Sequence, residues 1–131
     1  MEKECVFCKI IKGEIPSYKI YEDEDTLAFL DISADVLGHT LVILKEHTKN
    51  FVETPMDKLI LLTSTAQKIA KHYIEEVGFD GVQIVVNNGE SAGQTIMHLH
   101  IHILPSIDEK NHRFDCVKSN DFEKVSSMLS V

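Results

Sequence analysis

The sequence contains no run of basic residues and no hydrophobic run long enough to cross a membrane. Its 131 residues include 13 lysines and arginines against 21 aspartates and glutamates, a formal net charge of −8. A chain with this balance repels a nucleic-acid backbone unless its basic residues cluster, so nucleic-acid binding is not expected. A membrane-spanning helix needs roughly 18 consecutive apolar residues, and residues 1–15 also lack the apolar centre of a signal peptide. We therefore expect no membrane association and a cytoplasmic location.

Cysteine is scarce, which excludes the disulfide framework of a small secreted protein. The chain has three cysteines, an odd number, with two of them in Cys5-x-x-Cys8 and Cys116 alone. The spaced pair is open to three interpretations: a redox pair, half of a metal site, or two small buried residues. No second pair of this spacing completes a four-cysteine site. Internal repeats and low-complexity tracts are absent as well, so residues 1–131 are predicted to form a single domain.

The hydrophobic patterns predict an α+β domain with an antiparallel sheet, one long helix and short terminal helices. Thr54 is predicted to cap the long helix, Pro55 to occupy its first position, and Gly78 to close it. The predicted elements are a helical turn over 7–12, strands over 18–22, 26–32, 39–44, 82–86 and 98–104, the long helix over 55–77, and a weak helix over 121–129.

Three of the seven histidines alternate with large aliphatic residues in the last predicted strand. Side chains two apart on a strand share a face at a spacing of roughly 6.7 Å, so one row should hold the imidazoles of His98, His100 and His102. Leu99, Ile101 and Ile103 should then face the core, and Pro105 is predicted to end the strand. Neutral imidazoles could bind a metal or attack phosphorus, and protonated ones could donate hydrogen bonds to an anion.

A polar loop with two glycines, residues 87–95, leads into this strand. Glycine lets backbone N–H groups approach a bulky anion closely, and long polar loops beside a reactive strand tend to hold ligands. Loop and histidines together favour attack of a histidine nitrogen on phosphorus, which divides one difficult displacement into two easier ones. The alternative is that the loop is merely a turn.

These segments resemble the histidine triad family of nucleotide hydrolases. HLHIHIL fits the family signature His-x-His-x-His-x-x with hydrophobic x, and further blocks resemble the family in order and spacing: CVFCKIIKGEIPS, YEDED, AFLDIS, GHTLVILKEH and NNGESAGQT. The resemblance covers roughly residues 5–105, and the tail over 106–131 lies outside it. The N-terminal block is most similar to the nucleoside phosphoramidase-like branch.

The resemblance implies a histidine triad fold whose two-fold homodimer joins two sheets, and an enzyme that hydrolyses a nucleoside monophosphate bonded to an amine or phosphate leaving group. No organic cofactor is implied. His100 resembles the nucleophile that takes up the nucleotidyl group, His102 the residue that holds the phosphate oxygens, and His39 a fourth histidine that supports charge there.

The remaining site residues are also implied by the resemblance. Gln94 and Thr95 look like contacts to the phosphate or leaving group, and Asn87 and Gly93 like lining of the same pocket. Asp31 is similar to the acid that binds the ribose hydroxyls, a role that also suits a carboxylate chemically because charge-assisted hydrogen bonds are strong. The apolar slot around the base resembles a set that is equally suited to plain core: Phe7, Ile10, Phe29, Ile32 and Leu41.

Family members with the cysteine pair resemble zinc proteins in which two histidines complete the site. In this sequence those positions are His47 and His98, which together with Cys5 and Cys8 give the mixed sulfur and nitrogen set that zinc accepts. We favour a structural zinc ion over reduced, metal-free thiols.

Some positions depart from the family pattern. Ser106 stands where many relatives carry arginine, and the tail contains no tryptophan. The AGQT segment is shared with the branch that cleaves dinucleoside polyphosphates. Hydrolysis of those compounds and nucleotidyl transfer therefore remain alternatives, although transferases tend to replace the third histidine by glutamine. Two further alternatives are a non-catalytic protein that binds zinc or nucleotide, and catalysis by a metal on all three histidines.

Overall fold

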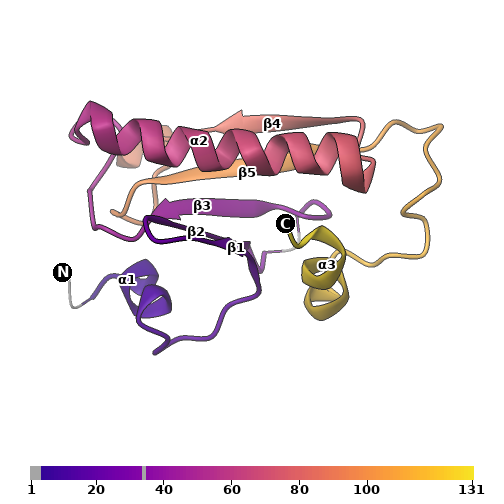
Figure 1. Cartoon of the computed structure of the whole chain (residues 1–131), viewed down its shortest axis with the longest axis horizontal. Coiled ribbons are helices and arrows are strands. Elements are labelled where there is room, and N and C mark those ends of the chain that lie inside the picture. Colours follow the sequence, from indigo (N-terminus) through magenta and orange to yellow (C-terminus); the bar gives the residue numbers. More distant parts are fainter. Residues whose placement is uncertain (1–3, 34) are drawn as a thin grey trace.

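An antiparallel five-stranded sheet organises the structure, a computed structural model that describes residues 4–33 and 35–131. The strand order is β1-β2-β3-β5-β4. Figure 1 shows the helix α2 running lengthwise along the sheet, with the short helices α1 and α3 near the two ends of the chain. The strands are β1 (Lys19–Glu22), β2 (Thr26–Leu30), β3 (Thr40–Leu44), β4 (Gly81–Val85) and β5 (His100–Ser106), and the α-helices are α1 (Val6–Ile11), α2 (Met56–His72) and α3 (Phe122–Leu129). The predicted α+β architecture is confirmed.

Hydrophobic clusters cover both faces of the sheet centre, which explains why every residue of β2 and β3 is buried. The larger cluster lies under α2 and α3 and includes Leu99, Ile101 and Ile103, as the alternating pattern predicted. The smaller cluster lies under α1 and includes Phe7 and Phe29. The histidines that alternate with the aliphatic residues are therefore on the α1 side of the sheet.

The strand that carries the histidines is shifted relative to its predicted limits. β5 begins at His100, and His98 precedes the ladder. The strand also runs through Pro105, although proline at this position predicts the strand end. The Ser106 carbonyl accepts a hydrogen bond from the Asp80 amide (3.1 Å), so the backbone groups of Pro105 point to the opposite edge of β5, toward β3. The pairing of β5 with β3 has already ended at Ile103. Proline is tolerated there because no ladder hydrogen bond is needed.

The long helix has the predicted apolar stripe but different ends. Leu59, Leu62, Ala66 and Ile69 are buried along α2. The predicted cap is wrong: Pro55 is the N-cap, and the Thr54 hydroxyl instead donates to the Asn50 carbonyl. The last turn widens into a π-helix, η1 (Tyr73–Val77), before Gly78 closes it with a φ of 103°, in the left-handed region that favours glycine.

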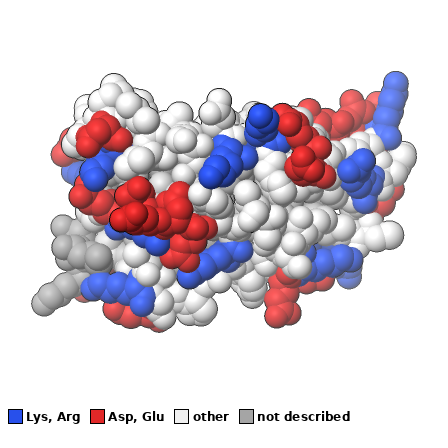
Figure 2. Space-filling view, viewed as in Figure 1, with Lys and Arg blue, Asp and Glu red and all other residues white. Residues whose placement is uncertain are grey.

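β4 and β5 pair as an antiparallel hairpin, and the loop that joins them contains a short 3₁₀ turn, η2 (Glu90–Ala92). Within the described residues, no helix is long and apolar enough to span a membrane. Figure 2 shows the lysines and arginines of one face scattered among acidic side chains, as expected for a chain without a basic run.

Candidate active site and metal centre

The hydrogen bonding of His100 determines which ring nitrogen is available for chemistry. Its Nδ1 lies 2.8 Å from the His98 carbonyl oxygen. A carbonyl only accepts, so Nδ1 carries the proton and Nε2 keeps its lone pair. The ring is 6% exposed and packs edge-on against Phe7, with the ring centres 5.2 Å apart. His100 is therefore held in the tautomer that a nitrogen nucleophile requires.

His102 and His39 form a second pair beside His100. The rings of His100 and His102 lie 4.9 Å apart, and His39 Nε2 lies 3.0 Å from His102 Nδ1. Asp31 Oδ2 is 3.7 Å from the same His39 nitrogen. The structure thus brings together four residues that lie apart in the sequence, from β5 and from the loop that joins β2 and β3.

Burial favours the neutral forms of the β5 histidines. It lowers the pKa of His100, and the nearby His39 lowers it further, against the opposing effects of the His98 carbonyl and Asp31. Burial also lowers the pKa of His102, together with the charges of His100 and His39. The lowered pKa favours the neutral ring, with its proton on Nδ1 and a lone pair on Nε2.

An apolar cavity of about 310 Å³ lies next to these histidines on the α1 side of the sheet. Asp31 is among its lining residues, and its carboxylate lies 3.7 Å from His39 Nε2. All five residues implied for the base slot line this cavity: Phe7, Ile10, Phe29, Ile32 and Leu41. Four of them are also buried core, and only Ile32 is largely exposed. The cavity size is at the lower end of the range of about 300–1,000 Å³ found for small-molecule sites.

The loop before β5 places its predicted contact residues in different surroundings. The Gln94 side chain is 1% exposed: its oxygen accepts from the Gly89 amide, and its nitrogen donates to the carbonyls of Lys49 and Ile96. Gln94 thus braces the loop from inside. Asn87 lies against Gly93.

Cys5, Cys8, His47 and His98 converge at the start of α1, with one donor atom from each within 4.8 Å of all the others. Cys5 Sγ and Cys8 Sγ lie 3.3 and 3.6 Å from His98 Nδ1, and Cys8 Sγ lies 3.3 Å from His47 Nδ1. Ligands of a tetrahedral zinc ion are about 3.3–3.8 Å apart, given Zn–N and Zn–S bonds of about 2.0–2.3 Å. The four side chains therefore fit one zinc ion.

His98 is oriented for ligation by its second nitrogen. Its Nε2–H donates to the Leu44 carbonyl oxygen (2.9 Å), which leaves the Nδ1 lone pair facing the two sulfurs. Burial, aided by the charges of His47 and His100, lowers the pKa of the ring to about 4 against the opposing effect of the Leu44 carbonyl. His98 and His100 contact the same Phe7 ring, so the cysteine–histidine cluster adjoins the candidate nucleophile without sharing its reactive nitrogen.

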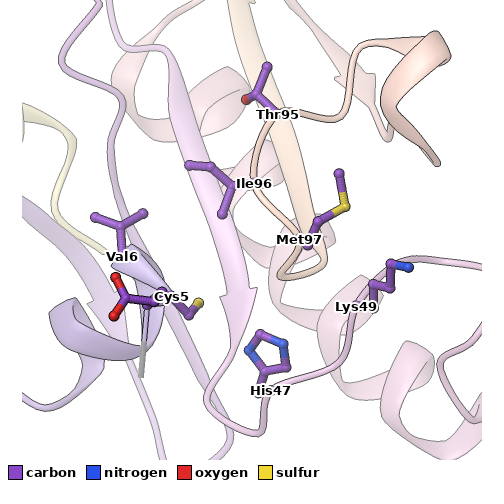
Figure 3. A pocket seen from close by; sticks show the side chains of 8 residues that line it. Cys5, Val6, His47, Lys49, Thr95, Ile96 and Met97 are labelled. Carbon is purple, nitrogen blue, oxygen red and sulfur yellow. The ribbon is translucent and has the colours of Figure 1, made fainter. Parts of the chain in front are cut away.

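A second cavity, of about 540 Å³, opens over the cysteine–histidine cluster. Figure 3 shows the Cys5 side chain and the His47 ring reaching toward each other in this cavity, with Thr95, Ile96 and Met97 on its other side. Thr95, implied to contact the phosphate or leaving group, lines this cavity and not the apolar one. Ile96 and Val6 line both, so the two cavities are neighbours.

One member of the site could not be found in the sequence. Asp35 Oδ1 lies 2.7 Å from His39 Nδ1, on the side of the ring away from His102. It lies in an irregular loop and belongs to no motif, so no periodicity or spacing indicated it.

The chain is similar in sequence to several known proteins. A model of the HIT domain matches residues 12–109. A HIT-like protein of Methanocaldococcus jannaschii that has not been characterised is 45% identical over 123 residues, covering 92% of this chain and 95% of its own. The adenosine 5'-monophosphoramidase of Saccharomyces cerevisiae is 39% identical over 130 residues, covering 98% and 80%. An adenylylsulfatase of Arabidopsis thaliana is 42% identical over 105 residues, covering 80% and 53%.

Solved structures include a close match to this fold. A zinc-bound histidine triad family protein of Mycobacterium smegmatis superposes with a TM-score of 0.84 at 36% identity, covering 96% of this chain and 90% of that one. That protein is zinc-bound, and in this chain Cys5, Cys8, His47 and His98 form a donor set that zinc accepts.

Proposed function

Because this chain belongs to the histidine triad (HIT) family, we propose that it hydrolyses nucleoside monophosphates linked to an amine or phosphate leaving group. The observation that carries this proposal is the His98 carbonyl bond to His100, which leaves Nε2 of a neutral imidazole unprotonated. Two relatives with named activities, a phosphoramidase and an adenylylsulfatase, differ in the leaving group and both act on adenylylated compounds. The shared part of such substrates is the nucleoside monophosphate.

The proposed reaction has two displacements at phosphorus. His100 Nε2 attacks, forming an N–P bond as the bond to the leaving group breaks, and the leaving group departs with the bonding electrons and takes up a proton. Water then attacks the nucleotidyl-histidine, breaks the N–P bond, and releases the nucleoside monophosphate and the neutral imidazole. His102 and His39 stabilise the charge on the phosphoryl oxygens in both steps.

The apolar cavity is proposed to hold the nucleoside. The base would lie among Phe7, Phe29 and Leu41, and the ribose hydroxyls would donate to Asp31, which lines the same cavity. Asn87 and Gly93 would line the phosphate side. Gln94 would act through the loop that it braces, and Thr95 would reach the part of the leaving group that extends into the neighbouring cavity.

Cys5, Cys8, His47 and His98 are proposed to bind a structural zinc ion. All four ligand positions would be filled by protein, so the ion would have no open position for substrate. Bound zinc would neutralise the thiolates and tie α1 and the chain after β3 to the start of β5. The four side chains themselves position Phe7 and the backbone carbonyl that orients His100.

The assay that tests this function compares adenosine 5'-phosphoramidate with a diadenosine polyphosphate. We expect AMP release from the phosphoramidate with a kcat on the order of 1 s⁻¹ or more, and slower cleavage of the polyphosphate. Because burial lowers the pKa of His100 below its ordinary value, the acid limb of the pH–rate profile should lie at lower pH than the titration of a free imidazole. Faster cleavage of the polyphosphate would favour the alternative branch, and nucleotide binding without turnover would indicate a binding protein.

We also propose a homodimer joined along β4. Among the described residues, this strand pairs on one side only, with β5. Ile84 at its centre points to the same side of the sheet as α2 and is 50% exposed. Sedimentation velocity should give about twice the monomer mass of 14.8 kDa. Ile84→Lys should shift the protein toward monomer, whereas Lys19→Glu at the opposite edge should not. A wild-type monomer at micromolar concentration would contradict the dimer.

A further inference from the structure

Asp35 is held in place beside His39 by three hydrogen bonds to the same carboxylate oxygen. Oδ1 lies 2.7 Å from His39 Nδ1, and it accepts from the Ser33 hydroxyl (3.1 Å) and from the Val36 amide (3.0 Å). The Asp35 side chain is 51% exposed, whereas that of His39 is 7% exposed. A partly solvated carboxylate thus reaches a buried imidazole in a prearranged geometry.

The contacts continue from His39 into the active site as a chain of three groups. Asp35 Oδ1 meets His39 Nδ1, and His39 Nε2 meets His102 Nδ1 at 3.0 Å. A carboxylate only accepts, so His39 Nδ1 carries a proton. The bond between the two imidazoles then has two possible directions, and each one leaves the proton on a different nitrogen of His102.

The direction of that bond depends on the charge of His39. A doubly protonated His39 donates from Nε2, so His102 Nδ1 accepts and His102 Nε2 carries the proton. A neutral His39 accepts at Nε2, so His102 carries its proton on Nδ1 and has no N–H left for a phosphate oxygen. The titratable groups that face His39 are Asp31 and Asp35 from the loop between β2 and β3, and His100 and His102 from β5. Two carboxylates therefore face this ring, with Asp35 Oδ1 at 2.7 Å from His39 Nδ1 and Asp31 Oδ2 at 3.7 Å from His39 Nε2.

We propose that Asp35 is a positioning residue that holds His39 as a cation and thereby fixes His102 with its proton on Nε2. In this tautomer His102 can donate to a phosphate oxygen. The tautomer follows from the contacts once His39 is a cation, and its use in catalysis rests on the proposed function. Removal of the Asp35 charge should free His102 to adopt the other tautomer, and it leaves both histidine side chains in place.

The charge states of the neighbours agree with this arrangement. Partial burial alone would raise the pKa of the Asp35 carboxyl, but the hydrogen bond and charge of His39, with the bonds from Ser33 and Val36, bring it below its ordinary value. Burial lowers the pKa of His102, aided by the charges of His100 and His39, so a neutral ring is available to accept at Nδ1.

The variant Asp35→Asn tests the proposal because an asparagine oxygen can still accept from His39 Nδ1 while the charge is lost. The chain offers a matched control in Asp115→Asn, which removes the charge from a solvent-exposed pair, His112 Nδ1 and Asp115 Oδ2 at 3.0 Å. ¹⁵N NMR of histidine-labelled protein without substrate should show His102 protonated at Nε2 in the wild type and in Asp115→Asn. In Asp35→Asn the proton should move to Nδ1.

Kinetics provide the second readout. Asp35→Asn should lower kcat for the phosphoramidate about tenfold and change KM less than twofold, because His102 is still present but donates to the phosphoryl oxygen only in its minor tautomer. The alkaline limb of its pH–rate profile should move to lower pH, a change that a purely structural loop residue would not produce. Asp35→Glu, which keeps the charge, should recover part of kcat.

The two readouts separate the proposal from the function on which it rests. A wild-type His102 protonated at Nδ1, or an unchanged His102 tautomer in Asp35→Asn, would overturn the role of Asp35 even in an active enzyme. The expected tautomers in a protein that does not turn over any phosphoramidate would leave the positioning role standing and refute the proposed function. An active wild type whose Asp35→Asn variant keeps its full kcat would remove the catalytic part of the proposal.

Discussion

Replacing His100 with alanine is expected to lower kcat for adenosine 5'-phosphoramidate by at least about 10³-fold, because the covalent step requires its Nε2. Nucleotide binding should remain, since the apolar cavity and Asp31 are not altered. Stopped reactions of the wild type analysed by mass spectrometry should contain a nucleotidyl adduct on His100. Calorimetry with AMP measures the binding that should survive in the variant.

Two further variants distinguish loss of the nucleophile from damage to the fold. His100→Asn keeps a side-chain N–H able to reach the His98 carbonyl, so it preserves the local hydrogen bond without an imidazole nucleophile. His112→Ala removes a histidine that is 74% exposed and should leave turnover unchanged. Full activity in His100→Ala would refute the mechanism, and an equal loss in His112→Ala would show that the assay reports stability.

The second large effect concerns the cysteine–histidine cluster. Cys5→Ser should abolish stoichiometric zinc binding and lower the melting temperature by roughly 10 °C, which corresponds to about 2–4 kcal/mol for a chain of this size. Serine is a poor zinc ligand but a good N-cap, so it can replace Cys5 Sγ as acceptor for the Cys8 amide at the start of α1. The loss of stability would therefore report the metal and not the helix cap. Since the proposed zinc ion takes no part in the chemical steps, kcat at a temperature where the variant is folded should change little.

Cys116→Ser is the matched control, because Cys116 is exposed and lies outside the cluster. It should retain the wild-type melting temperature and zinc content. Metal analysis and thermal melts with a strong chelator complete the comparison. Identical melting temperatures of the wild-type protein with and without chelator would argue against a structural zinc ion, whatever the effect of the serine variant.

Local patterns in the sequence predicted most of the sheet and the placement of the triad. Alternation places Leu99 and Ile101 in the core under α2 and the histidines on the opposite side, because successive side chains leave a strand on opposite faces. The stripe on α2 follows from its three- and four-residue spacing in the same way. Such periodicities are properties of the local backbone, so they can be recognised without knowledge of the neighbours.

The limits of the elements were less accessible to this reasoning. β5 continues through Pro105 because its pairing with β3 stops at Ile103, and the sequence of β5 does not show where that pairing stops. Thr54 leaves the helix cap to Pro55 because its hydroxyl has a closer partner in the Asn50 carbonyl. In both cases the identity of the residue allows several outcomes, and the nearest hydrogen-bonding group in space selects one.

The sequence by itself determined which reactive groups the chain carries, since a row of imidazoles beside a glycine-containing loop and a cysteine pair can be identified from residue types and spacing. Only the tertiary structure decided how each group is used. In the fold, the Gln94 amide is buried and bonded to backbone groups, and Asp35 lies beside His39. Backbone carbonyls next to His98 and His100 decide which ring nitrogen carries the proton. The physical reason is that a hydrogen bond depends on distances of about 3 Å between groups far apart in the chain, which only the completed packing establishes.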